Sequence, residues 1–80
     1  MTPKETYDKV FIEAFDLDSS QLDDALAYGT VDAWDSVGQM NLIADIEDAF
    51  GIMMSPDDFI DFNSYSGGMD LLAQKYGVVF

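Results

Sequence analysis

A helical pattern is clearest in residues 34–51, which read WDSVGQMNLIADIEDAFG. From Ser36 to Phe50, apolar residues recur at the three- and four-residue spacing of one helix face. The expected core stripe is Leu42, Ile43, Ile46, Ala49 and Phe50. Polar residues fall on the opposite side, and Gly51 suits the end of a helix. This segment therefore predicts an amphipathic helix that starts directly after Asp35.

The N-terminal segment predicts a second helix. Thr2 can cap it, Pro3 suits the first helical position, and Glu5 completes a capping box. Aromatic residues then follow at helical spacing. We expect this helix to run from about Pro3 to Phe15.

The C-terminal third predicts two more helices. Ser55-Pro56 repeats the cap-then-proline signal for a short helix from Pro56 to about Asp61. That helix should bury Phe59, Ile60 or Phe62. Asn63-Ser64 can cap a last helix that ends before Gly77 and carries, at helical spacing, Tyr65, Met69, Leu72 and Tyr76.

The connection over residues 16–35 is long and rich in turn-forming residues. We expect Leu22, Leu26 and Val31 to attach it to the core, with one short turn around residues 20–26. Residues 1–80 therefore predict a single domain of the all-α class. The architecture is a small four-helix bundle, with three main helices, one short helix and a long first loop.

The composition excludes several kinds of chemistry. The 80 residues include no His, and neither Cys nor Arg occurs. Disulfides, thiolate nucleophiles, zinc-thiolate sites and bidentate phosphate clamps are therefore excluded, and we expect no metal site. No apolar run approaches the roughly 18 residues of a membrane span, and the first residues lack the layout of a signal peptide. We expect a cytoplasmic protein that neither spans nor binds membranes.

The charge is strongly acidic and uneven. Three Lys stand against 16 Asp and Glu, so the formal net charge is −13. Between Val10 and Gln74 there is no basic residue. Such a surface repels nucleic acid and anionic lipid and attracts basic partner proteins.

Asp35-Ser36 is the most informative pair for chemistry. A helix N-terminus presents free N–H groups and a positive dipole end, which favour a phosphate esterified to the Ser36 hydroxyl. The negative charge of Asp35 would not help to bind phosphate, so we interpret Asp35 as a residue that a modifying enzyme recognises. The simpler interpretation is structural: Ser36-x-x-Gln39 can form a capping box, or Asp35 can be the cap.

The wider context resembles the carrier-protein family, which comprises acyl carrier proteins and the aminoacyl or peptidyl carriers. Trp34-Asp35-Ser36-Val37 is similar to the family's Asp-Ser-aliphatic signature at the start of its second helix. Glu47-Asp48-Ala49-Phe50 matches the Glu-x-x-Phe ending of that helix. Length, acidity, the long first loop and the short third helix fit as well.

The resemblance implies a function. Ser36 would receive 4′-phosphopantetheine from coenzyme A, and the thiol of this arm would carry an acyl or aminoacyl group as a thioester. The protein would be a carrier and not an enzyme, since the reactive sulfur belongs to the prosthetic group. The implied partners are a phosphopantetheinyl transferase, a loading ligase and a downstream transferase or synthase, each presenting basic docking patches. A monomer is the family expectation.

The expected partner-binding residues surround Ser36 on the same helix. The acids are Asp35, Asp45, Glu47 and Asp48, and the remaining contacts are Val37, Met40, Asn41 and Ala44. For each acid, a solvated helix face is an equally good interpretation. For Met40, ordinary core packing is the alternative.

Two positions depart from carriers of fatty-acid synthesis, which usually have acidic residues where this chain has Gly38 and Asn41. Together with Trp34, Gly38 resembles carriers of specialised pathways, such as polyketide, peptide or cell-surface polymer synthesis, including the D-alanyl carriers. We therefore favour a specialised role over housekeeping fatty-acid synthesis.

Three other function classes compete with the carrier interpretation. A calcium loop starting at Asp16 fails, because its sixth and twelfth positions are Gln21 and Ala27. A hydrolase with paired carboxylates would need a pocket that a small helical core hardly leaves room for. The main alternative is an acidic protein-binding module or inhibitor that mimics nucleic acid, with Ser36 only a helix cap.

Overall fold

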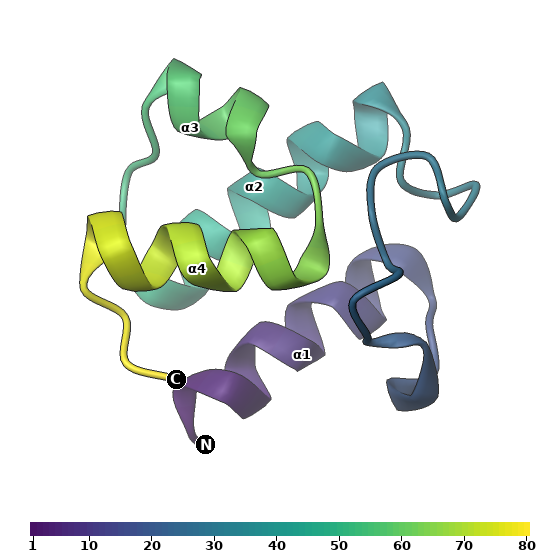
Figure 1. Ribbon diagram of the computed structural model, residues 1–80, viewed down its shortest axis with the longest axis horizontal. Coiled ribbons are helices and arrows are strands. Elements are labelled where there is room, and N and C mark those ends of the chain that lie inside the picture. Colours follow the sequence, from purple (N-terminus) through teal and green to yellow (C-terminus); the bar gives the residue numbers. More distant parts are fainter.

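The computed structural model describes residues 1–80 and consists of helices without a strand. The elements are α1 (Pro3–Phe15), a 3₁₀ turn η1 (Ser19–Gln21), α2 (Ser36–Phe50), α3 (Pro56–Asp61) and α4 (Tyr65–Tyr76). In Figure 1, α2 passes behind α4, with α1 below and the short α3 above. The predicted all-α bundle of three main helices and one short helix is confirmed.

The helices begin and end where local capping satisfies their backbone. Thr2 and Glu5 form the predicted capping box of α1, with both hydrogen bonds at 3.1 Å. Ser55 caps α3 and Ser64 caps α4 by accepting the N–H three residues later. Gly51 and Gly77 follow α2 and α4 in the left-handed conformation, which glycine adopts at no steric cost.

Aromatic side chains dominate the core. The buried ones are Tyr7, Phe11, Phe15, Trp34, Phe62 and Tyr65, and Leu42, Ile43, Ile46 and Leu72 fill the space between them. One part of the predicted core was wrong: Ala49 is exposed, because it lies past the edge of the α2 stripe. Among the three alternatives predicted for the short helix, Phe62 is fully buried, Phe59 is half-buried and Ile60 is 70% exposed.

The long connection is attached to the rest of the molecule by side chains and by backbone. Leu26 is buried, and Leu22 and Val31 pack against the core, as predicted. The short turn lies at Ser19–Gln21, at the start of the expected region. The second half of the long connection pairs with the segment that joins α3 to α4. Tyr28 N donates to Asn63 O and Tyr65 N donates to Leu26 O, both at 2.9 Å.

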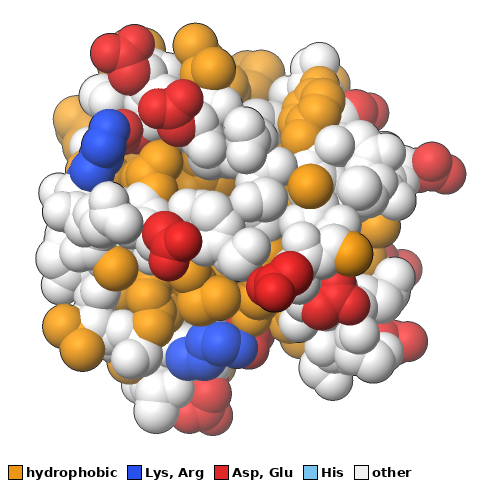
Figure 2. Space-filling view, viewed as in Figure 1, with side chains coloured by type: hydrophobic (Ala, Val, Ile, Leu, Met, Phe, Trp, Pro, Cys, Tyr) orange, Lys and Arg blue, Asp and Glu red, His pale blue; other side chains and the backbone are white.

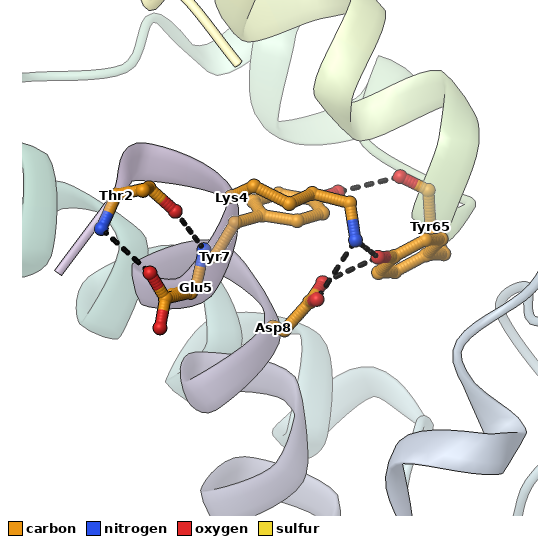
Figure 3. Close-up of polar contacts among 6 residues, drawn as sticks. All are labelled: Thr2, Lys4, Glu5, Tyr7, Asp8 and Tyr65. Atoms are coloured by element: carbon orange, nitrogen blue, oxygen red, sulfur yellow. Dashed lines mark hydrogen bonds and ion pairs between the residues drawn. The ribbon is translucent and has the colours of Figure 1, made fainter.

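A polar cluster joins the start of α1 to the start of α4 (Figure 3). The Tyr7 hydroxyl donates to the carbonyl oxygen of Tyr65 at 2.6 Å. The Tyr65 hydroxyl donates to Asp8, and Lys4 Nζ donates to both of these side chains. Burial raises the pKa of Tyr7 far above its usual value, so this phenol stays a neutral donor.

All three lysines are used in ion pairs within the molecule. Lys4 pairs with Asp8, Lys9 with Glu13 and Lys75 with Asp58. Most acidic side chains therefore have no cation nearby, and Figure 2 shows them spread over one whole face with few basic groups between them. No helix is long and apolar enough to cross a membrane.

We expect salt to stabilise this fold. Raising the NaCl concentration from about 10 mM to about 150 mM shortens the range of charge interactions from about 30 Å to about 8 Å. Weaker repulsion among the acids should raise the melting temperature, followed by far-ultraviolet circular dichroism. Lys9→Gln, which removes one exposed cation, should show a larger rise. A melting temperature that stays flat or falls over this range would contradict the expectation.

Asp58 is the one buried carboxylate. It accepts hydrogen bonds from Lys75 Nζ and from the Tyr76 hydroxyl, both at 2.6 Å, and so ties α3 to the end of α4. The hydrogen bond from Lys75 is the main reason that the pKa of Asp58 lies below its usual range. A lowered pKa in the folded state means that the ionised carboxylate stabilises the fold, and that this stability is lost in acid.

Asp58→Asn tests this link. The variant should melt at a lower temperature than the wild type at neutral pH, and the difference should shrink as the pH falls below about 4 and the wild-type carboxyl takes up its proton. Asp57→Asn, on the exposed neighbouring residue, is the matched control and should change little. A difference that stays constant down to the lowest pH would show that the charge of Asp58 does not matter.

Candidate functional site

Ser36 is the first residue of α2, and its side chain is exposed. Asp35 is the N-cap: its Oδ1 accepts the N–H of Gly38 at 2.9 Å. The alternative capping box of Ser36 with Gln39 does not form, because Gln39 points into the core. Capping therefore leaves the hydroxyl of Ser36 free for other contacts.

The first turn of α2 also provides unused donors. The backbone N–H groups of Ser36 and Val37 have no protein acceptor, as is usual at a helix start. They lie at the positive end of the helix dipole, which favours an anionic group on the Ser36 oxygen.

Gln39 holds the start of α2 in place. Its Oε1 accepts the indole N–H of Trp34 at 2.6 Å. Its Nε2 donates to the carbonyl oxygens of Phe59 at 2.9 Å and of Phe62 at 2.6 Å. Each of these groups would cost about 1–3 kcal/mol if it were buried without a partner. The amide therefore joins the residue two before Ser36 to the end of α3.

Gly38 makes the closest backbone approach at the site. A Cβ placed there would lie 1.9 Å from the carbonyl oxygen of Ala33 and 3.2 Å from the ring of Phe15. No side chain fits without movement of the backbone. The absence of an acidic residue at this position thus has a local steric reason.

A single side chain is hydrogen-bonded to Ser36. The hydroxyl of Tyr28 lies 3.2 Å from Ser36 Oγ, and either oxygen can donate. Tyr28 comes from the long connection and is 48% exposed. Tyr28 was not among the predicted site residues, since seven residues of irregular chain separate it from Ser36 and no sequence pattern links the two.

A groove of about 620 Å³ opens beside Ser36. Besides Ser36, its walls are Ala27, Tyr28, Gln39, Phe59, Ile60 and Asn63. The groove lies between the long connection and α3. Its walls are partly apolar, from Phe59 and Ile60, and include the side-chain amide of Asn63.

Most of the predicted partner-binding residues lie on the surface of α2. Asp35, Asn41, Ala44, Asp45 and Asp48 are exposed. Val37 is 66% exposed and Met40 is 62% exposed, so the core interpretation of Met40 was wrong. Glu47 differs from the others. It is half-buried, and its Oε2 accepts the N–H of Met54 at 2.8 Å, which fastens the chain after α2.

No group of three or more acidic side chains is arranged to hold a metal ion. The groups able to receive a cofactor are instead a free hydroxyl, two free amides and the neighbouring groove. They fit a covalently attached, elongated anionic group that is held by one end.

Comparison with known protein families decides the class of this group. Residues 34–67 match the family model described as the phosphopantetheine attachment site. This segment carries the attachment site of the acyl and peptidyl carrier proteins. No curated protein and no solved structure gives a significant match to the chain.

The match covers the segment that contains Ser36 and the first turn of α2. It begins at Trp34, includes all of α2 and α3, and ends within the first turn of α4. The cofactor implied by the match is a covalently attached 4′-phosphopantetheine. The resemblance seen in the sequence is thereby confirmed. The match names no cargo and no partner.

Gly38→Ala should destabilise the fold. In a helix, alanine is ordinarily favoured over glycine by about 1 kcal/mol, so helix propensity alone predicts that the variant is more stable. The close contact with Ala33 predicts the opposite: overpacking should lower the free energy of unfolding by about 1–3 kcal/mol. Urea unfolding measures the difference.

Asn41→Ala is the matched control, because Asn41 is exposed on the same helix and should change stability by no more than about 0.5 kcal/mol. A stabilised Gly38→Ala variant would show that the backbone is not in contact at this point.

Proposed function

We propose that residues 1–80 form one carrier domain and that Ser36 Oγ bears the 4′-phosphopantetheine. The observation that carries the proposal is the exposed Ser36 hydroxyl, which starts α2 inside the matched segment and is released from capping by Asp35. If the Ser36 hydroxyl capped α2, modification would remove the capping hydrogen bond. Because Asp35 makes that hydrogen bond, modification of Ser36 leaves the capping of α2 intact.

The attachment is a group transfer from coenzyme A. Ser36 Oγ attacks the phosphorus that bears the pantetheine, a new P–O bond forms, and the pyrophosphate P–O bond breaks. Adenosine 3′,5′-bisphosphate leaves, and the serine proton passes to a base of the transferase.

Once attached, the arm supplies a thiol that holds an acyl or aminoacyl group as a thioester. The residues of this chain have simpler tasks. The first turn of α2 places its free amides beside the phosphodiester, and Asp35 keeps that turn closed. Loading and transfer belong to partner enzymes, so we propose a carrier and not an enzyme.

The partners are a phosphopantetheinyl transferase, a loading ligase and a downstream transferase or synthase. We place their basic docking patches against α2, where Asp35, Asp45 and Asp48 are exposed and unpaired with lysine. Val37 and Met40 supply exposed apolar contacts beside Ser36. Glu47 contributes less, because its carboxylate already accepts the N–H of Met54.

We propose a specialised pathway, with an acyl or aminoacyl cargo and a monomeric protein in the cytoplasm. Gly38, Asn41 and Trp34 support this, since they resemble carriers outside fatty-acid synthesis. At position 38, the close approach of the Ala33 carbonyl oxygen excludes the acidic side chain that fatty-acid-synthesis carriers usually have there.

Modification in vitro tests the attachment. The apo protein is incubated with coenzyme A, magnesium and a broad-specificity phosphopantetheinyl transferase, and its intact mass is measured. The wild type should gain one phosphopantetheine group, and Ser36→Ala should gain none. Ser19→Ala, an exposed serine in η1, is the control and should be modified like the wild type.

Two results would overturn the proposal. A mass gain that survives in Ser36→Ala would move the attachment to another residue. No gain with a panel of transferases, on a protein shown to be folded and helical, would favour the acidic binding module in which Ser36 is only part of the helix start.

A further inference from the structure

Tyr28 is held in place by the backbone around it. Its N–H donates to Asn63 O at 2.9 Å, and Ala27 forms an antiparallel bridge with Ser64. On its other side, Gly29 N donates to Trp34 O at 3.0 Å. The loop that carries Tyr28 is therefore tied both to the α3–α4 connection and to the residue two before Ser36. Its hydroxyl reaches Ser36 from a fixed base.

Attachment of a phosphodiester changes which atom must donate. In the unmodified protein, either the Tyr28 hydroxyl or the Ser36 hydroxyl can supply the hydrogen. Esterified Ser36 Oγ has no hydrogen, so within this pair only the Tyr28 hydroxyl can donate to the new group. All three lysines are engaged in ion pairs elsewhere. Tyr28 is the side chain already within hydrogen-bond distance of the Ser36 oxygen, and it joins the free backbone N–H groups of Ser36 and Val37 as a donor to the phosphodiester.

The groove offers a place for the rest of the arm. Phe59 and Ile60 of α3 form its apolar wall, and Ile60 is 70% exposed there. Asn63 adds a side-chain amide on the exposed surface. The pantetheine chain begins with a gem-dimethyl group and continues through two amides, so it matches an apolar wall followed by an amide partner. Because Ser36 itself lines the groove, an arm attached there enters it directly.

We propose that Tyr28 is a positioning residue for the phosphopantetheine arm. Its hydroxyl donates to the phosphodiester on Ser36, and its ring, with Ile60 and Asn63, directs the arm into the groove between the long connection and α3. The inference rests on the proposed attachment to Ser36. It adds a resting site for the arm on this domain when no partner holds it.

NMR of the modified protein tests the resting site. Isotope-labelled protein that bears an unlabelled arm should give nuclear Overhauser contacts from the gem-dimethyl protons to the Tyr28 ring and the Ile60 methyls. In Tyr28→Phe, the phosphorus resonance of the diester should shift and the contacts to Ile60 should weaken or vanish. The spectrum of the unmodified variant should stay close to that of the wild type away from Tyr28, which separates positioning from loss of fold.

A second pair of variants tests the groove wall. Ile60→Ser should lose the arm contacts, whereas Met53→Ser, at an apolar residue that is 87% exposed outside the groove, should keep them. Both should still gain the mass of the arm.

An arm without contacts to Tyr28 or Ile60 in the wild type, with a phosphorus resonance unchanged in Tyr28→Phe, would overturn this inference and leave the attachment intact. Failure of the attachment itself would appear earlier, as the absence of a mass gain.

Discussion

The buried amide of Gln39 is the contact on which the site depends. It accepts the indole N–H of Trp34 and donates to the carbonyl oxygens of Phe59 and Phe62, and the Gln39 side chain is almost completely buried. A buried polar group of this kind stabilises only one arrangement, because any other leaves it unpaired. The start of α2, the end of the long connection and α3 therefore keep one relative position. The surface around Ser36, including the groove, is built on those three segments.

Local signals in the sequence were enough to predict the helices. Thr2 and Glu5, Ser55 and Pro56, and the glycines after α2 and α4 act within one turn, so their effect can be read from adjacent residues. The same reasoning located Ser36 at the first position of α2. It left open whether Asp35 or Ser36 is the cap, since both residue types serve equally well.

Features that depend on segments far apart in the chain escaped prediction. Gln39 looked like a capping residue but is buried, because Trp34, Phe59 and Phe62 bring three polar backbone and ring groups to it. Tyr28 looked like one more residue of an irregular loop. Only the pairing of that loop with Asn63 and Ser64 carries its hydroxyl to Ser36. The sequence also left open which of Phe59, Ile60 and Phe62 is buried, since a short helix shows too little periodicity to identify its inner face.

The place of Trp34 has a practical consequence. It is the single tryptophan of the chain, it is fully buried, and its ring packs against Phe11 and Phe15 two residues before Ser36. Its fluorescence therefore reports on the packing next to Ser36 without any added label. A partner protein that loosens the start of α2 on binding would reveal this in the emission of Trp34, provided that its own tryptophans are replaced or silent. The domain contains an optical probe beside the residue proposed to carry the arm.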